Sequence, residues 1–367
     1  MANFTEYLRW RGDIPFSYVP LNEIDSMIFC ELCYIPYADD IVEKINTQGV
    51  TICELSELVF NQKNLKSIGA ILPTDKIYNL LMLVSNTERF KNIMIKNYVN
   101  EVDLSSQKQF SAMWFDVFGD AYIGYCGTDD TIVGWKESLN LSTMTPIPSQ
   151  EESGRYLSKI ANCSKGNIYL GGHSKGGNLA EYAALTAEKE IQQRIISVHS
   201  FDGPGFQKDF VEKYSNDEIS KKIVKILPQS AIVGLIFDSA GSMRHIISNA
   251  KGFYQHDAFT WEIESGSFVL ANGPDKKSIK FYEFMKNLYY DIDESERAEF
   301  IEAIYHLLSS NQSKTLTDIV NDKFSFFVAI LKTEGKYKKP LFKMFKKFLH
   351  ERYFKRKRQN NKKEQKI

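Results

Sequence analysis

The eight residues 170–177, Leu-Gly-Gly-His-Ser-Lys-Gly-Gly, place Ser174 among closely spaced glycines. An apolar run, 168–170, comes directly before them, and a helical pattern continues after them to Leu185. A serine on a sharp strand-to-helix turn needs small residues two positions before and two after it, because the strand and the helix pass close together there. We therefore interpret the run as a nucleophile elbow with Ser174 as the nucleophile.

A glycine-rich phosphate loop or an ordinary turn is the alternative interpretation of this run. A phosphate loop requires Gly-Lys-Ser/Thr, whereas here the order is Ser174-Lys175-Gly176. In an elbow, the backbone N–H of Lys175 at the positive end of the helix is an oxyanion donor. We expect the Lys175 side chain to be exposed to solvent and His173 to pack behind the serine.

Strand and helix patterns alternate around the elbow. Strand patterns at 168–170, 195–201 and 223–227 are separated by helical stretches, and hairpin patterns occupy 107–127 and 259–270. Strands that alternate with helices predict a largely parallel sheet covered on both faces. The sequence thus predicts an α/β-hydrolase fold with a mostly parallel central sheet flanked by helices.

Four regions follow from these patterns. Residues 1–105 are mostly helical in pattern and are expected to pack on the core, and residues 106–275 form the catalytic core. Residues 276–335 are expected to add further helices, with helix starts at Pro274-Asp275, at residues 291–293 and at Ser313. Residues 336–367 form a basic amphipathic helix and a tail.

Composition narrows the class of protein. Of the 367 residues, 43% are hydrophobic, which is ample for a buried core. The five cysteines are an odd and sparse set that suits reduced thiols, and Cys30-x-x-Cys33 lacks the second pair or histidine that a metal site needs. No apolar stretch reaches the ~20 residues of a membrane span, and no signal peptide is visible. We expect a cytoplasmic protein without a metal or a cofactor.

The net charge of zero conceals an asymmetry. Residues 336–367 hold 14 Lys/Arg and two acids, a net charge of +12, and the rest of the chain carries −12. The helix pattern from Pro340 to about Phe354 has lysines on one face and apolar residues on the other. This pattern favours peripheral binding to an anionic membrane over a solvated tail, and nucleic-acid binding is the least favoured alternative.

The elbow resembles the Gly-His-Ser-Leu-Gly-Gly run of the class 3, triacylglycerol lipase-like α/β-hydrolases. It is most similar to a bacterial lipase-like family in which lysine follows the serine, as Lys175 does here. Residues 122–129 followed by Trp135 resemble the lipase strand that ends in Arg-Gly-Thr/Ser before a Trp, and residues 201–206 resemble a lipase strand end. Residues 255–261 resemble the segment that bears the lipase histidine. The resemblance covers about residues 20–275.

The resemblance implies two further site residues. It assigns Thr128 as an oxyanion donor beside Lys175, and it assigns His256 as the base. The pattern of the chain agrees for His256, because a polar loop just before a strand suits a base. His245 is the rival base, whereas His199 lies inside a strand pattern, and His306 and His350 lie on late helices.

The acid is the least defined member of the site. Where class 3 lipases carry it, after the strand 223–227, this chain has Gln229-Ser230. Asp202 ends the preceding strand and is the first choice, followed by Asp238 and then Asp257. A turn-forming aspartate is the alternative interpretation of Asp202, and a serine–histidine dyad is the alternative to a triad.

Together these features predict a serine hydrolase that cleaves acyl esters through an acyl-enzyme on Ser174. The resemblance implies an acyl ester or lipid substrate of the lipase or esterase type. Two alternatives remain open at this stage. One is a catalytically inert hydrolase fold used for binding, favoured by the missing lipase-position acid, and the other is an acyltransferase that passes the acyl group to an alcohol or thiol.

Overall fold

The computed structural model describes residues 2–62, 65, 67–68, 73–290, 292–309, 315, 335–343 and 346–347. Its centre is an eight-stranded sheet whose strand order follows the chain from β1 to β8. The strands are β1 (Val50–Thr51), β2 (Met94–Asp103), β3 (Lys108–Val117), β4 (Asp120–Tyr125), β5 (Ile168–His173), β6 (Ile195–Phe201), β7 (Ile223–Pro228) and β8 (Ser242–Ile246). Strands β1 to β4 pair antiparallel, and β4 to β8 pair parallel.

Helices cover both faces of the sheet. Those up to β8 are α1 (Phe4–Arg11), α2 (Glu23–Leu32), α3 (Asp39–Thr47), α4 (Ile52–Phe60), α5 (Thr74–Ser85), α6 (Ile132–Asn140), α7 (Pro148–Cys163), α8 (Lys175–Thr186), α9 (Lys189–Arg194), α10 (Lys208–Tyr214) and α11 (Asp217–Ser220). Side chains alternate between the faces, so Phe115 joins the core under α2 and α5, whereas Trp114 joins the core under α7 and α8. The predicted α/β-hydrolase fold is confirmed.

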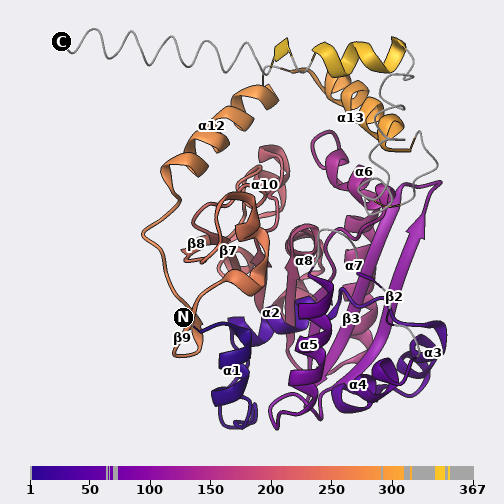
Figure 1. Ribbon diagram of the computed structural model, residues 1–367, viewed down its shortest axis with the longest axis vertical. Helices are drawn as coiled ribbons and strands as arrows, with labels where there is room; N and C mark the ends of the chain where they lie inside the picture. The colour runs from indigo at the N-terminus through magenta and orange to yellow at the C-terminus, as the bar shows by residue number, and fades with distance from the viewer. Residues whose placement is uncertain are drawn as a thin grey trace.

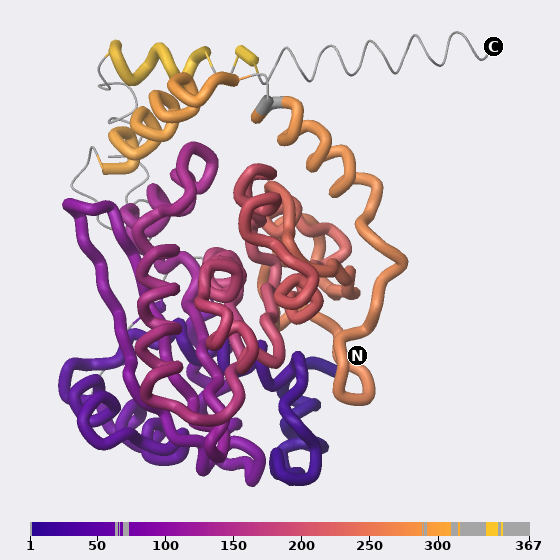
Figure 2. Tube along the Cα trace, turned by 180° about the vertical axis from the view of Figure 1, so that it is seen from behind, coloured from indigo at the N-terminus to yellow at the C-terminus, as the bar shows by residue number. Residues whose placement is uncertain are grey.

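The remaining elements follow β8. They are the short helices η1 (Gly252–His256) and η2 (Ala258–Thr260), the hairpin β9 (Ile263–Glu264) and β10 (Ser267–Phe268), and the helices α12 (Lys276–Tyr290) and α13 (Glu294–Ser309). Helices α12 and α13 lie along one end of the molecule, opposite α1 and α4 (Figures 1 and 2). Residues 335–343 are also helical, so this helix begins before Pro340, its predicted start.

The parallel register brings three chain segments to one edge of the sheet. Tyr125 of β4 pairs with Gly172 of β5, and His173 pairs with Phe201 of β6. The carboxyl ends of β4, β5 and β6 are therefore level with one another. Residues that directly follow these strands must lie close together, at the edge where ligands bind in open α/β sheets.

Several local predictions are confirmed. Thr51 caps α4 through a capping box with Glu54, since each side chain accepts a hydrogen bond from the other residue's backbone N–H. The predicted hairpin at 107–127 is the β3–β4 pair, and Cys30 and Cys33 are buried free thiols. Strand β2, in contrast, lies within the region predicted to be mostly helical, where it pairs with β3 over nearly its whole length.

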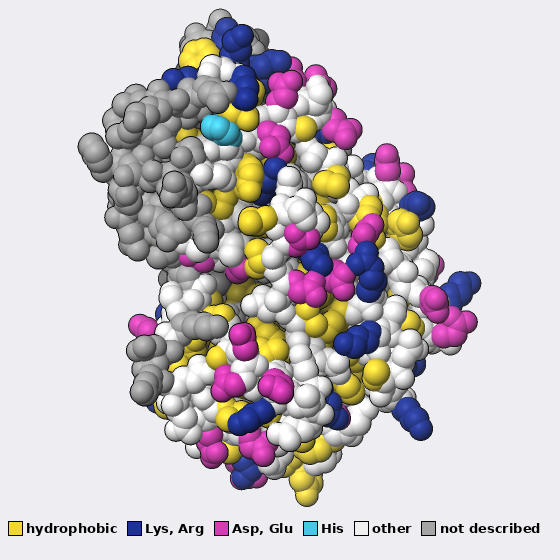
Figure 3. Space-filling model, turned by 90° about the vertical axis from the view of Figure 1, so that its right-hand side faces the viewer, with side chains coloured by type: hydrophobic (Ala, Val, Ile, Leu, Met, Phe, Trp, Pro, Cys, Tyr) yellow, Lys and Arg dark blue, Asp and Glu magenta, His cyan; other side chains and the backbone are white. Residues whose placement is uncertain are grey.

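Other predictions differ from the structure or concern residues outside the described ones. The hairpin predicted at 259–270 is reduced to the two-residue strands β9 and β10, because residues 258–260 form η2. The helix start predicted at Ser313 and the tail from residue 348 lie outside the described residues. Among the residues that are described, no helix is both long and apolar enough to cross a membrane. Acidic and basic side chains are interspersed over the face shown in Figure 3.

Candidate active site

Ser174 lies on the turn between β5 and α8. Its backbone has φ +57° and ψ −129°, a conformation that few residues other than glycine adopt. Its N–H donates to the carbonyl oxygen of Phe201 at 2.9 Å. A Cβ at Gly172 would clash with the backbone of Gly176, and a Cβ at Gly176 would clash with the carbonyl oxygen of Tyr125, so both positions are glycine. The strained turn thus has the strand-turn-helix geometry predicted for an elbow.

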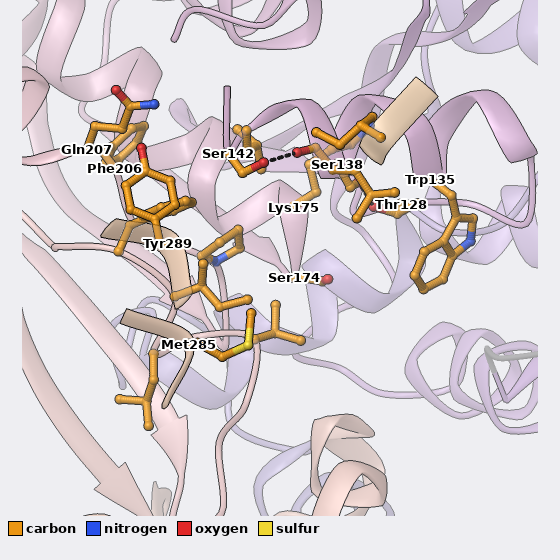
Figure 4. Close-up of a pocket in the computed structure, with 18 of the residues that line it drawn as sticks. Thr128, Trp135, Ser138, Ser142, Ser174, Lys175, Phe206, Gln207, Met285 and Tyr289 are labelled. Carbon is orange, nitrogen blue, oxygen red and sulfur yellow. Dashed lines mark hydrogen bonds between the residues drawn. The ribbon is translucent and has the colours of Figure 1, made fainter. Parts of the chain in front are cut away.

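Ser174 lines a cavity of about 1070 Å³. Its hydroxyl makes no hydrogen bond to any described residue. Figure 4 shows Ser174 between Trp135 of α6 on one side and Met285 of α12 on the other. The walls are largely apolar, and α12 and α13 supply Met285, Tyr289, Phe300 and Ile301. The helices after residue 275 therefore border the same space as the serine.

His256 and Asp202 are in direct contact beside this cavity. His256 Nδ1 lies 2.6 Å from Asp202 Oδ2. Asp202 is 1% exposed, and its second oxygen, Oδ1, accepts a hydrogen bond from the Gly234 N–H at 3.0 Å. An imidazole that donates through Nδ1 keeps Nε2 available as a proton acceptor. The structure thus brings together the residues predicted as base and acid, and His256 lines the cavity with Ser174.

His173 packs against the backbone and the ring of His256. Its Nε2 donates to the His256 carbonyl oxygen at 2.9 Å, and the two ring centroids are 4.7 Å apart. Its Nδ1 lies 3.3 Å from the Tyr34 hydroxyl and 3.4 Å from a carboxyl oxygen of Glu31. Burial lowers the pKa of His173 well below its usual value and raises that of Glu31. A neutral His173 can therefore hold His256 in place.

The rival site residues are not partners in this His256–Asp202 pair. His245 is on β8, does not line the cavity, and has a pKa lowered by burial. Asp238 lines the cavity. Two hydrogen bonds, of 2.7 and 2.9 Å, join its backbone to the backbone of Phe206. Asp257 accepts from Lys76 Nζ at 2.8 Å. Among the described carboxylates, only Asp202 forms a hydrogen bond with the His256 ring.

His199 lies within β6, as the sequence indicated, and this placement has a consequence for stability. Burial, followed by the charge of Arg244, lowers its pKa from 6.5 to about 4. Between these values the unfolded chain binds a proton that the folded chain does not, so stability falls as the pH drops from 6.5 to 4. The loss at pH 4 is up to about 3 kcal/mol, and less where solvent reaches the ring.

Urea unfolding at pH 7 and at pH 4 measures this effect. The drop in unfolding free energy between the two pH values should be smaller for His199→Gln than for the wild type. An equal drop in both proteins would show that His199 takes no part in the acid sensitivity.

Thr128 and Lys175 flank the serine from two chain segments. Thr128 follows β4 and lines the cavity, and its Oγ1 is hydrogen-bonded to Ser138 Oγ at 2.6 Å. Lys175 is the first residue of α8. The expectation that the Lys175 side chain meets solvent was wrong, because it is only 1% exposed and forms an ion pair with Glu137 at 2.8 Å.

Sequence reasoning missed the residues that surround the predicted ones. Glu137 and Gln109 were not singled out, and a lysine at the start of a helix that packs on the sheet was the one signal that could have prompted a search for an acidic partner. The helices from 274–333 were expected to be able to cap the pocket, but no motif identified which of their residues line it. No group of three or more His, Cys, Asp or Glu suited to hold a metal occurs in the described part of the chain.

Comparisons with known proteins give the following similarities. A solved structure titled M37 lipase matches with 16% identity and a TM-score of 0.35, over 57% of this chain and 67% of that chain. Lip2 lipase from Yarrowia lipolytica matches with 12% identity and a TM-score of 0.35, over 70% of this chain and 87% of that chain. No curated protein matches the sequence. A family model described as Mbeg1-like matches residues 84–306.

Proposed function

Because the chain belongs to the Mbeg1-like family and has a lipase-like α/β-hydrolase fold, we propose that it is a serine hydrolase that cleaves carboxylic esters bearing acyl chains. The observation that carries the proposal is the 2.6 Å contact between His256 Nδ1 and Asp202 Oδ2. This pair lies beside a cavity that His256 and the strained Ser174 both line. Nucleophile, acid and base follow one another along the chain in the order Ser, Asp, His that is typical of this fold.

The proposed reaction is acyl transfer to water. His256 Nε2 takes the Ser174 proton while Ser174 Oγ attacks the ester carbonyl, and Asp202 stabilises the imidazolium that forms. The backbone N–H groups of Thr128 and Lys175 donate to the oxyanion. The alcohol leaves with the proton from His256, and a water that His256 deprotonates then attacks the acyl-enzyme and releases the acid.

The cavity supports a substrate with a sizeable apolar part. Small-molecule sites are commonly ~300–1,000 Å³ and mostly apolar, and this one is about 1070 Å³. Met285 and Tyr289 of α12 line this cavity, and in Figure 4 they lie on the side of Ser174 away from Trp135. We therefore assign the acyl chain to the space between the elbow and α12. Membrane binding by residues 336–367 stays a prediction, since most of that tail lies outside the described residues.

Narrowing this space should change which esters are accepted. We expect Met285→Trp to lower kcat/KM for long-chain p-nitrophenyl esters by roughly tenfold or more, because the larger ring occupies the volume of several methylenes. The acetyl ester should be affected least, since its acyl group occupies the smallest part of this space. A series of esters of graded chain length measures the shift.

Ile279→Trp is the matched control for this variant. Ile279 lies on the same helix, is 41% exposed and does not line the cavity. It should leave the chain-length profile unchanged. If the Met285 and Ile279 variants share the wild-type profile, the acyl chain does not bind beside α12.

Two alternatives to a hydrolase, an inert binding protein and an acyltransferase, can be distinguished from it. The inert-protein alternative was favoured by the missing acid at Gln229-Ser230, and the contact of Asp202 with His256 supports an acid supplied from another strand. An acyltransferase would convert an ester and an added alcohol into a new ester. Chromatography of the products should give free acid as the main product, and a predominant new ester would replace the hydrolase by a transferase.

A further inference from the structure

The Lys175 ammonium is buried directly beneath the elbow. Its Nζ donates to the Gln109 carbonyl oxygen at 2.6 Å, to Gln109 Oε1 at 2.6 Å and to Glu137 Oε2 at 2.8 Å. The three donors of the ammonium are therefore all used. Burying an ion pair costs desolvation free energy that a well-packed apolar pair would not, so the pair is not explained by stability alone.

Glu137 joins three further elements at the same point. It is fully buried on α6, and its Oε2 also accepts from the Gln109 N–H of β3 at 3.0 Å. Its Oε1 accepts from the Ser149 N–H at the start of α7 at 2.9 Å. One carboxylate thus connects α6, β3 and α7 to the helix that begins at Lys175.

The same cluster reaches the loop that carries Thr128. Gln109 Nε2 donates to the carbonyl oxygen of Gly127 at 3.4 Å, one residue before Thr128. Thr128 Oγ1 is bonded to Ser138, the neighbour of Glu137 on α6. Both segments assigned to the oxyanion hole, at Thr128 and at Lys175, are therefore tied to one buried group of charges.

We propose that Lys175 and Glu137 are a positioning pair that sets the separation of the two oxyanion donors. This inference rests on the proposed hydrolase function. The oxyanion donor at residue 175 is a backbone N–H, so changing the side chain leaves the donor in place and alters only where it is held. The pair should therefore affect the transition state and not the binding of the ester.

Lys175→Met tests the pair. We expect kcat for a short-chain p-nitrophenyl ester to fall roughly 10–100-fold, because misplaced donors lose much of their effect on the oxyanion. KM should change little, and the rate of labelling by a fluorophosphonate should fall with kcat. Enzyme concentration is taken from the end point of labelling, so that unfolded protein does not count.

Arg89→Met is the matched control. Arg89 and Asp25 form another ion pair with both side chains 0% exposed, joined by Arg89 Nε and Asp25 Oδ1 at 2.8 Å, and neither residue lines the cavity. This variant should lower the Tm but leave kcat per labelled site unchanged. A loss of kcat equal to that of Lys175→Met would make the effect one of stability and overturn the proposal.

A double variant, Lys175→Met with Glu137→Gln, keeps the test decisive if the single variant folds poorly. It removes the unpaired carboxylate, so the Tm should recover while kcat stays low. Recovery of kcat together with the Tm would overturn the positioning role. If the wild type reacts with the fluorophosphonate and both Lys175 variants react as fast, only this inference fails, whereas an unreactive wild type removes the proposed function as well.

Discussion

Ser174→Ala should lower kcat for ester hydrolysis by at least about 10⁴-fold, because in the proposed mechanism Ser174 supplies the covalent nucleophile. The fold should be unaffected, since the Ser174 hydroxyl makes no hydrogen bond to a described residue and alanine meets the same backbone strain at φ +57°. Steady-state hydrolysis of a short-chain p-nitrophenyl ester, with the Tm measured in parallel, checks both statements.

Ser142→Ala is the matched control for the nucleophile. Ser142 lines the same cavity, and its hydroxyl donates to the Leu139 carbonyl oxygen at 2.8 Å. This variant should keep most of the wild-type activity. Comparable losses in the two serine variants would mean that the cavity, and not the chemistry of Ser174, limits the rate.

Asp202→Asn should have the next largest effect, a fall in kcat of about 10⁴-fold with little change in KM. An asparagine amide would donate to His256 Nδ1, which forces the imidazole to carry its proton on Nε2. The ring then cannot accept the Ser174 proton. The substitution preserves the size of the side chain, so the hydrogen bond from Gly234 to Oδ1 can persist.

Asp238→Asn distinguishes the two acids weighed from the sequence. Asp238 lines the cavity, whereas the 2.6 Å contact with the His256 ring belongs to Asp202. Its variant should retain nearly full kcat. A larger loss for Asp238→Asn than for Asp202→Asn would reassign the acid, and equal small losses would favour a serine–histidine dyad.

The sharp strand-to-helix turn at Ser174 was predictable because its determinants are local. Two glycines at fixed offsets, a short apolar strand and a helix pattern all lie within residues 168–185. The clash between a Cβ at Gly172 and the backbone of Gly176 shows the physical requirement that this spacing reflects. These local residues constrain the conformation of the turn independently of the rest of the chain.

The neighbourhood of the elbow depends on contacts that are distant along the chain. Lys175 is buried because Glu137 and Gln109 converge on it from positions 38 and 66 residues earlier. Nothing near Lys175 in the sequence specifies those partners. The local sequence therefore favoured a solvent-exposed lysine, and contacts from distant parts of the chain bury it instead.

Strand β2 was missed for a related reason. Its residues 94–103 include Asn97, Asn100 and Glu101, which have low strand propensity. The strand forms because it pairs with β3, and its register shifts between Lys96 and Val99. Pairing with a neighbouring strand outweighs local preference here, and a single sequence does not reveal that pairing.

Peptide mapping after reaction with a fluorophosphonate tests the central claim most directly. Trypsin releases residues 166–175 as one peptide, Gly-Asn-Ile-Tyr-Leu-Gly-Gly-His-Ser-Lys, in which Ser174 is the only serine. We predict a single phosphonyl adduct on Ser174 of the wild type and none on Ser174→Ala. An unlabelled wild type, or an adduct that persists in Ser174→Ala, would contradict the assignment of Ser174 as an activated nucleophile.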